Sequence, residues 1–304
     1  MLSIIIVSYN TRELLKGCLR SLFEHAPAAE IVVVDNASRD GSTEMMRVEF
    51  PDVKVVALAQ NLGFAAANNI GLKHTKGEFV LLLNSDTYVE DGSLTRCAAW
   101  LKANPQVGAV TPRLIGFEGK AQISVHPSHS FRNKFRSMVW LKPTPIAEGP
   151  DVAPGWLPGA ALMLRRKALE QIKVLLDETY FMYWEDTDLC ARLAAAGWKL
   201  AVFQDGHVRH LGGGSSVGTG GLRPELLAHF LRGKYRWYAR HRPRWERAGL
   251  WSLEAVEVVR KTLRGAAYPR RRRVEWSQAK ALAQVLAQLL WRALFRNRSQ
   301  AVGR

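Results

Sequence analysis

The sequence predicts an α/β domain built on a doubly wound, mostly parallel sheet, followed by a basic helical extension. Two observations support this prediction. Short apolar runs alternate with helix-like segments near the N-terminus, which is typical of parallel strands buried on both faces. The net charge of +16 is also divided unevenly, because residues 222–304 contain 20 Lys and Arg against 5 Asp and Glu, whereas the remainder is almost neutral.

The elements of the sheet follow in order along the chain. The predicted strands are Leu2–Val7, Ile31–Val34, Val53–Ala57 and Phe79–Leu83. In the first helix we expect Asn10 to be the N-cap, with Glu13 three residues later and an apolar face made of Leu14, Leu15, Cys18, Leu19, Leu22 and Phe23. A second helix follows Asp40-Gly41-Ser42, and a third spans about 64–73. This βαβαβαβ order predicts the doubly wound sheet.

The pattern becomes irregular after Gly116, where prolines mark loops up to Gly159. An aromatic, strand-like run at 180–184 then turns into a helix that Gly197 is placed to end. A Gly/Ser-rich loop at 212–221 precedes two candidate helices, the second from Ser277 to about Arg296, which is amphipathic and basic.

The cysteines and the N-terminus bear on the compartment. Cys18, Cys97 and Cys190 are odd in number and far apart, which argues against a disulfide framework or a thiolate metal site and favours a reducing compartment. We see no basic segment before the first apolar run, hence no secretory signal, and no apolar stretch near the roughly 20 residues that span a bilayer. We therefore expect a cytoplasmic protein, with peripheral attachment at the inner face of the plasma membrane as an option.

Three polar clusters follow predicted strands, and all three should lie at one edge of the sheet, where α/β proteins bind ligands. They are Ser8-Tyr9-Asn10, Asp35-Asn36 and Asn84-Ser85-Asp86. Asp86 offers a hard oxygen ligand for Mg²⁺ or Mn²⁺ bridging a diphosphate, although this triplet is also suited to capping a helix. Asp35 can accept a hydrogen bond from a nucleobase N–H or a ribose hydroxyl, or can simply belong to a turn.

Acidic residues crowd the first turn of the helix after the aromatic run, where the helix dipole itself favours negative charge. Asp186 shares the inward side of Leu189 and Leu193, as a general base on a pocket floor would. The neighbouring charge of Glu185 would raise the proton affinity of one of the pair. Asp188 lies four residues before Arg192, and we expect a surface ion pair there.

Two further segments supply candidate ligand-binding groups. Small residues between Asn61 and Asn68 permit close approach of a ligand, although alanine-rich packing explains the alanines equally well. His207 and His210 precede the glycine-rich loop, and a neutral imidazole from either would complete a mixed oxygen and nitrogen metal site with Asp86.

Taken together, these residues resemble the family 2 inverting glycosyltransferases of GT-A fold, and most of all their bacterial rhamnosyltransferase-like branch. Seven stretches occur in the family's order across about residues 2–216: IIVSYN at 5–10, VVDNAS at 33–38, NLGFAAAN at 61–68, LLNSDT at 82–87, PGAALMLR at 158–165, YWEDTDLC at 183–190 and HLGGGS at 210–215. One such string is weak evidence, whereas seven in order are specific.

The resemblance implies a role for each cluster. A nucleotide pocket would lie at Ser8, Tyr9, Asn10, Asp35 and Asn36, with Asn61, Gly63 and Asn68 closing around the base, ribose or sugar. Asp186 would be the catalytic base with Glu185 beside it, Asp86 after Asn84 and Ser85 would bind Mn²⁺ or Mg²⁺, and His210 would be a metal or diphosphate ligand. The acceptor or sugar side would contain Trp156, Gly159, Ala160, Tyr183 and Trp184. The motif at 84–86 departs from the family pattern because it has a single carboxylate.

The resemblance also implies a division of the chain. Residues 1–221 would be the catalytic domain, with a nucleotide-binding half at about 1–115 and an acceptor-binding half at about 116–221, and 222–304 would be a basic helical extension. The expected partners are a nucleotide-sugar donor, with dTDP-rhamnose preferred over UDP- or GDP-sugars, and a glycan or lipid-linked acceptor. Separately, the basic residues and the apolar helical stripe of 270–304 suggest that this segment meets an anionic membrane surface, the alternative being a helix packed on the catalytic domain.

Two other classes are weaker interpretations. An NAD(P)-dependent enzyme would need GxGxxG after the first strand, where the chain reads Ser-Tyr-Asn-Thr-Arg. Nucleic-acid binding is suggested by the pI of about 10.1, but the basic charge is confined to the tail, and we expect no nucleic-acid partner.

Overall fold

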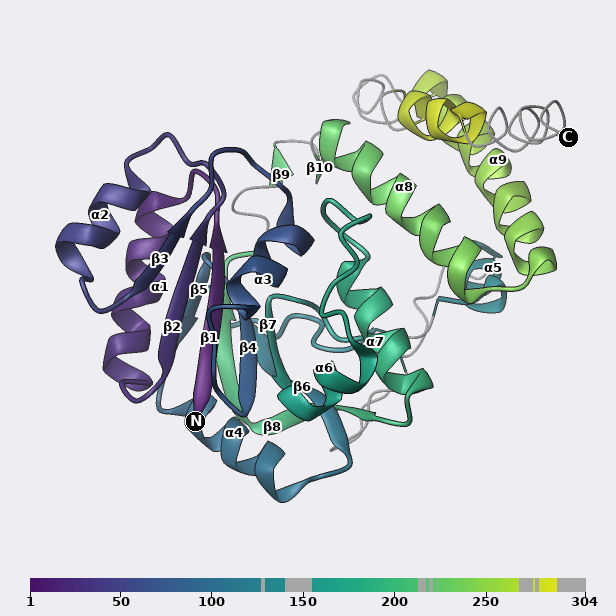
Figure 1. Cartoon of the computed structure of the whole chain (residues 1–304). Coiled ribbons are helices and arrows are strands. Elements are labelled where there is room, and N and C mark those ends of the chain that lie inside the picture. The colour runs from purple at the N-terminus through teal and green to yellow at the C-terminus, as the bar shows by residue number, and fades with distance from the viewer. Residues whose placement is uncertain are drawn as a thin grey trace, which may run out of the picture. The chain divides into compact units, whose positions relative to one another are not determined.

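The N-terminal part of the chain forms one eight-stranded sheet with helices on both faces (Figure 1). In this computed structural model the described residues are 1–126, 129–139, 155–212, 217–218, 221–222, 224–267, 276 and 279–288. The chain divides into two units, the first formed by 1–128 and 144–215 and the second by 129–143 and 216–304. Each unit has its own interior.

The sheet has the strand order β3-β2-β1-β4-β7-β6-β8-β5. Its strands are β1 (Leu2–Ser8), β2 (Glu30–Asp35), β3 (Lys54–Ala57), β4 (Phe79–Asn84), β5 (Thr87–Val89), β6 (Val107–Ile115), β7 (Ala161–Arg165) and β8 (Lys199–His210). The pairs β4–β7, β6–β7 and β5–β8 are antiparallel, and the other neighbours are parallel. The mostly parallel sheet expected from the sequence is confirmed, with β7 and β5 reversed.

Helices cover both faces because the central strands are apolar on both sides. Ile4 and Ile6 contribute to one core cluster and Ile5 to the other, and all three are fully buried. The first cluster contains residues of α1 (Arg12–His25), α2 (Ser42–Glu49) and α4 (Ser93–Ala103). The second contains residues of α3 (Phe64–Leu72), α6 (Arg166–Ile172) and α7 (Glu185–Ala195).

The four predicted strands and the third predicted helix agree with the structure to within one residue at each end. The predicted N-cap is wrong. Helix α1 begins after Thr11, and Asn10 adopts a left-handed backbone with φ of 53°. Its side-chain oxygen instead accepts a hydrogen bond from the backbone N–H of Arg39 at 2.8 Å, so Asn10 ties the turn after β1 to the loop after β2.

The aromatic run at 180–184 is not a strand, contrary to the expectation. Tyr183 and Trp184 have φ values of 70° and 76°, and two successive left-handed residues cannot continue an extended backbone. The segment is a tight loop that leads into α7. The predicted helix end is confirmed, because α7 stops at Ala195 and Gly197 has a φ of 87°.

The second unit consists mainly of helices α5 (Phe131–Val139), α8 (Pro224–His241), α9 (Arg244–Ala267) and a helical segment at 279–288. A short hairpin of β9 (Val217–Gly218) and β10 (Gly221–Leu222) precedes them. Where the sequence suggested two helices, the described residues form three helical segments, since Pro243 separates α8 from α9. Of the predicted helix at 277–296, residues 279–288 are helical and the remainder is outside the described residues, as is Arg270–Arg273.

Polar contacts attach α5 to α8 and α9 within this unit. The backbone N–H of Phe131 donates to Glu246 at 3.1 Å, and Arg242 donates to the carbonyl of His129 at 2.8 Å. A buried ion pair of Lys234 with Glu254 joins α8 to α9. In the part of the chain that the structure describes, no helix has the length and apolarity needed to cross a membrane.

Candidate active site

The three polar clusters lie together at one edge of the sheet. Ser8 is the register partner of Asp35 at the ends of β1 and β2, and Val7 is the partner of Asn84 at the end of β4. Parallel strands in register therefore bring Ser8, Asp35 and Asn84 side by side. The structure places these clusters as the sequence predicts, at the edge where ligands bind in open α/β sheets.

A chain of buried hydroxyl groups lies beneath this edge. Ser8 Oγ lies 2.9 Å from Thr11 Oγ1, which lies 3.0 Å from Ser85 Oγ. All three side chains are buried, so they fix the end of β1, the start of α1 and the turn after β4 relative to one another. Thr11 was absent from the sequence-based candidates, because a threonine one residue before a helix gives no signal beyond capping.

Asp35 has an unused acceptor. Its Oδ2 accepts a hydrogen bond from the backbone N–H of Ser38 at 3.0 Å, while its buried Oδ1 has no hydrogen-bond partner among the described residues. The residue is 2% exposed. Since a buried carboxylate oxygen left unpaired is costly, this atom is suited to a donor group of a ligand.

Asn36 and Tyr9 differ from Asp35. Both polar atoms of the Asn36 side chain are used within the chain, because Oδ1 accepts from Leu62 N–H at 2.9 Å and Nδ2 donates to the Gly63 carbonyl at 3.2 Å. Asn36 therefore shapes the loop before α3. Tyr9 is 46% exposed at the rim of the edge.

The loop before α3 lies in close backbone contact with the loop before α7. Asn61 Oδ1 accepts from Gly63 N–H at 2.9 Å, and Gly63 has a φ of 86°. A Cβ at Gly63 would lie 2.4 Å from the carbonyl oxygen of Phe181, and Phe64 N–H donates to that same oxygen at 2.8 Å. Only glycine fits this contact, which joins the α3 loop to the loop before α7.

Asn68 is fully buried on α3. Its Nδ2 donates to the Phe64 carbonyl at 2.9 Å, and its Oδ1 has no partner within the described chain. Helix α3 packs on β1 and β2. Asn68 therefore offers a second unused acceptor, on an element that contacts the strand ending in Asp35.

Asp86 and His210 come together at the other end of the cluster. His210 Nε2 lies 3.5 Å from Asp86 Oδ1, and both side chains are largely buried. Thr87 is the register partner of His210 in the β5–β8 pair, and Leu211 N–H donates to the Asp86 carbonyl at 3.0 Å. One carboxylate oxygen and one imidazole nitrogen at this spacing fit a divalent cation of the Mn²⁺ or Mg²⁺ kind, with further positions left for phosphate oxygens and water.

Gln122 determines which nitrogen of His210 is available. Its amide Nε2 donates to the His210 carbonyl at 2.7 Å, and its Oε1 lies 2.9 Å from His210 Nδ1. Because a carbonyl can only accept, the amide nitrogen must face it, and the amide oxygen must then face a protonated Nδ1. In the neutral imidazole Nε2 therefore keeps its lone pair on the side of Asp86. No sequence motif pointed to Gln122, which is 88 residues from His210.

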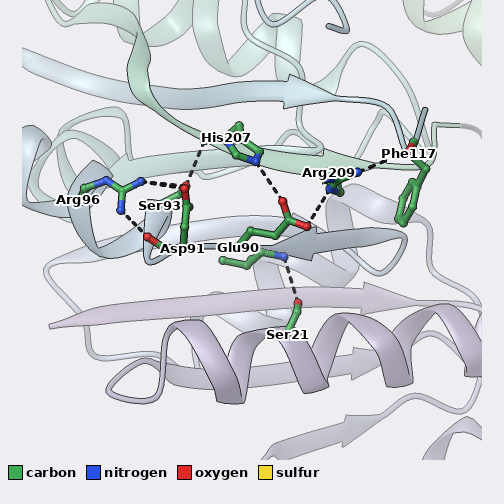
Figure 2. A network of polar contacts seen from close by, with 9 residues as sticks. Ser21, Glu90, Asp91, Ser93, Arg96, Phe117, His207 and Arg209 are labelled. Carbon is green, nitrogen blue, oxygen red and sulfur yellow. Dashed lines mark hydrogen bonds and ion pairs between the residues drawn. The ribbon is translucent and has the colours of Figure 1, made fainter. Parts of the chain in front are cut away.

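His207, the other histidine considered from the sequence, does not join Asp86. Figure 2 shows Glu90 between His207 Nε2 at 3.1 Å and Arg209 Nε at 2.8 Å. These bonds outweigh partial burial and keep the pKa of Glu90 below its usual value. In addition, Val89 N–H donates to Ser21 Oγ of α1 at 3.1 Å. This network holds β5 against β8 and α1. It therefore fixes the strand that follows Asp86 and the strand that ends at His210.

Among the described residues, no group of three or more His, Cys, Asp or Glu forms a metal cage. An ion bound by Asp86 and His210 would find no third His, Cys, Asp or Glu ligand among the described residues. This agrees with the single carboxylate in the motif at 84–86.

Asp186 lies at the start of α7 and is held in place by backbone donors. Gly159 N–H donates to its Oδ2 at 3.0 Å, and Thr187 N–H donates to its Oδ1 at 2.7 Å. Burial raises the pKa of Asp186, and these hydrogen bonds limit the rise. Gly159 passes close to this carboxylate, since a Cβ there would lie 3.6 Å from Asp186 Cβ.

Glu185 is buried beside it. Its Oε2 has no hydrogen-bond partner among the described residues. Burial, and then the charge of Asp186, raise the pKa of Glu185 well above its ordinary value. Of the two carboxyl groups, Glu185 therefore has the more strongly raised pKa and keeps its proton to the higher pH.

The loop before α7 is anchored by a buried ion pair, which corrects the expectation of a surface pair. Asp188 is fully buried and accepts from Arg192 at 2.6 Å. Arg192 also donates to the carbonyls of Val174 at 2.6 Å and Leu175 at 2.8 Å. The pair thus fixes the start of the segment that leads to Asp186.

The aromatic candidates occupy the same region. Trp184 is buried and Tyr183 is half-buried, and Trp156 stacks on His126 with ring centres 4.1 Å apart and planes 7° apart. Ala160 contacts the strand-end cluster, because its carbonyl accepts from Asn84 N–H at 3.0 Å. Through Gly159 and Ala160 the structure therefore connects the region of Asp186 with the end of β4. The glycine-rich residues 213–216 are outside the described residues.

Comparison with known proteins agrees with this arrangement. The sequence model described as Glycosyl transferase family 2 matches residues 3–172. The chain is 27% identical over 298 residues to the N-acetylglucosaminyl-diphospho-decaprenol L-rhamnosyltransferase of Mycobacterium tuberculosis, covering 87% of this chain and 94% of that one. It is 28% identical over 211 residues to the poly-beta-1,6-N-acetyl-D-glucosamine synthase of Staphylococcus epidermidis, covering 66% of this chain and 46% of that one.

Among solved structures, the fold matches the mannosyltransferase PcManGT from Pyrobaculum calidifontis in complex with GDP-Man and Mn²⁺. The TM-score is 0.58 at 18% identity, and the match covers 95% of this chain and 87% of that one. The expected GT-A architecture, a mixed sheet flanked by helices with a helical C-terminal region, is confirmed.

Proposed function

Because the chain belongs to glycosyl transferase family 2, we propose that it moves a sugar from a nucleotide-diphosphate donor to a hydroxyl group with inversion at the anomeric carbon. The observation that carries this proposal is Asp186. Hydrogen bonds from the backbone N–H groups of Gly159 and Thr187 orient its carboxylate. Burial raises its pKa towards the working pH, where a general base is most effective.

The reaction we propose is a single displacement. Asp186 takes the proton of the acceptor hydroxyl, and that oxygen attacks the anomeric carbon from the face opposite the departing nucleoside diphosphate. Because the pKa of Glu185 is raised well above its ordinary value, this neighbour would stay protonated to higher pH and add no second charge beside the base. Tyr183, Trp184 and Trp156 supply aromatic surface for the sugar and the acceptor, beside Gly159 and Ala160.

The donor would bind along the strand-end cluster. Asp35 Oδ1 and Asn68 Oδ1 are acceptors that lack partners in the described chain, which suits the N–H of a nucleobase and the hydroxyls of ribose. Ser8, Tyr9, Asn10, Asn36, Asn61, Gly63, Asn84 and Ser85 would form the surrounding wall. Asp86 and His210 would hold Mn²⁺ or Mg²⁺, which when bound neutralises charge on the diphosphate leaving group.

We favour dTDP-rhamnose as donor, with a UDP- or GDP-sugar as the alternative, and a glycan or lipid-linked acceptor in cell-surface polysaccharide synthesis. The support is the name of the Mycobacterium tuberculosis relative, which transfers L-rhamnose to a decaprenol-linked sugar, and its coverage of nearly the whole chain. In this proposal residues 1–221 are the catalytic domain, divided near 115 into donor and acceptor halves, and 222–304 are an extension.

We place the enzyme in the cytoplasm, attached peripherally to the inner face of the plasma membrane through 270–304. The excess of Lys and Arg in 222–304 supports this, because basic segments are attracted to anionic lipid headgroups. Vesicle binding that is unchanged after deletion of 270–304 would contradict this part of the proposal.

The test of the base is Asp186→Asn. We expect a loss of about 10²–10⁴-fold in kcat with nucleotide affinity nearly unchanged, because the amide keeps the shape of the side chain but cannot take a proton. Asp52→Asn, an exposed site before β3, is the matched control and should retain full activity. Full transfer by Asp186→Asn, with nucleotide still bound, would mean that Asp186 is not the base.

A further inference from the structure

The outward face of α9 carries no charge along its whole length. The exposed side chains that share this face are Trp245, Ala248, Ser252, Ala255, Val256, Val259, Thr262, Leu263 and Ala266. At 100° per residue these positions fall within an arc of about 120°. The four large apolar members, Trp245, Val256, Val259 and Leu263, are between 53% and 66% exposed.

The acidic residues of the same helix point inward, the reverse of what a water-facing helix requires. Glu254 is 2% exposed and pairs with Lys234, with Lys134 at 3.9 Å. Glu246 is also buried and accepts from Phe131 N–H. Glu257 pairs with Arg260 at 2.7 Å and with Lys261 at 3.8 Å. All three glutamates of α9 therefore pair with groups inside the unit, and no acidic side chain lies on the outward face of this helix.

Basic residues border the uncharged face. The exposed Arg244 lies at one margin, whereas beyond the other margin Arg260 follows at about 40° and the exposed Arg264 at about 80° on the helical wheel. Residues 222–304 together contain 20 Lys and Arg against 5 Asp and Glu. An apolar face with cationic margins on a strongly basic unit is complementary to a surface that is both apolar and anionic.

We infer that α9 lies in the plane of an anionic lipid surface, with Trp245, Val256, Val259 and Leu263 in the boundary between headgroups and acyl chains. The exposed Arg244 at the margin of the face then contacts lipid phosphates, and the net positive charge of residues 222–304 adds attraction to the anionic surface. A second copy of the chain is a poorer occupant, because the residues that border the face are cationic and would repel one another across a helix pair. This contact is separate from the one proposed for 270–304 and does not depend on which sugar is transferred.

The experiment is co-sedimentation of the full chain with phosphatidylcholine vesicles, with and without about one-third phosphatidylglycerol, in the absence of donor sugar. Val256→Glu and Val259→Glu place a charge on the face without filling any buried space. Val48→Glu on α2, where the valine is 70% exposed, is the matched control with the same change of charge. Thermal unfolding of each variant verifies that the fold is kept.

We expect binding to the anionic vesicles, weak binding to the neutral ones, and a fall of about tenfold in the partition coefficient of each α9 variant but not of Val48→Glu. Equal binding by the α9 variants and Val48→Glu would overturn the inference, as would wild type that fails to bind anionic vesicles. Loss of a concentration-dependent dimer in Val256→Glu would assign the face to a second copy instead. Transfer to a water-soluble acceptor should persist in the α9 variants, so failure of the lipid contact and failure of the proposed reaction give different results.

Discussion

Unpaired oxygen atoms at the sheet edge give the most direct account of what the site binds. Asp35 Oδ1 and Asn68 Oδ1 are buried acceptors without partners in the described chain. A buried acceptor left unsatisfied costs about 1–3 kcal/mol, so their presence is explained if a ligand supplies the donors. A nucleoside has such donors on its base and its ribose. The side chains that the sequence grouped with them, Asn36 and Asn61, have their Oδ1 atoms bonded to backbone N–H groups of the loop instead.

Gln122 gives a prediction at the scale of one residue. In Gln122→Leu both hydrogen bonds to His210 are lost, so the imidazole is free to change tautomer and to rotate away from Asp86. We expect the affinity for Mn²⁺, measured by titration of the electron paramagnetic resonance signal with a nucleoside diphosphate present, to fall about 10–100-fold.

The matched control for this change is Gln171→Leu. Gln171 on α6 also uses both amide atoms, with Ala196 and Trp198 as partners, and is remote from His210 in the sequence. It should leave Mn²⁺ affinity unchanged. If Gln122→Leu binds Mn²⁺ as tightly as wild type, the amide does not orient His210.

At the scale of elements, the first turn of α7 couples stability to pH. The pKa of Glu185 is raised well above the model-peptide value of 4.5 by burial and by the charge of Asp186. Between 4.5 and the folded pKa the folded state holds a proton that the unfolded state has lost, so the free energy of unfolding must fall as pH rises through this window.

Glu185→Gln should remove that fall, because the amide does not ionise. We expect its urea midpoint to exceed that of wild type at pH 8 and the difference to shrink towards pH 4.5. Glu24→Gln, at an exposed position on α1, should show no such effect. A difference between Glu185→Gln and wild type that is the same at both pH values would contradict the assignment of a neutral Glu185.

Some elements could be predicted from the sequence, whereas others depend on long-range packing. The strands β1, β2, β3 and β4 were predictable because each contains at least three consecutive apolar residues with polar residues nearby, and the carboxyl ends of β1, β2 and β4 located Ser8, Asp35 and Asn84. The β5–β8 pair was not, since Thr87–Val89 is too short to show a period and its partner is more than 100 residues away. The Glu90 network, the Gln122 contact and the left-handed turn at Tyr183 and Trp184 depend on that long-range packing.

At the scale of the whole chain, the two units differ in what their sequences reveal. The first unit contains most of the family match over 3–172 and the candidate site, and ordered motifs made both accessible from the sequence. In the second unit the net basic charge was visible, but the inward acids and the uncharged outward face of α9 were not. The sequence shows that α9 contains both acidic and apolar residues, but only its packing determines which of them face outward.

Binding of a nucleotide-sugar donor with a divalent cation at Asp86 can be measured through the thermal unfolding midpoint with nucleoside diphosphates, with and without Mn²⁺, for wild type and Asp86→Ala. Ligand at 100 times its Kd stabilises the folded state by about 2.7 kcal/mol. We predict that dTDP, or failing that UDP or GDP, raises the wild-type midpoint, that Mn²⁺ raises it further, and that Asp86→Ala abolishes the Mn²⁺ increment. No shift with any nucleoside diphosphate, or an Mn²⁺ increment that survives in Asp86→Ala, would contradict the account.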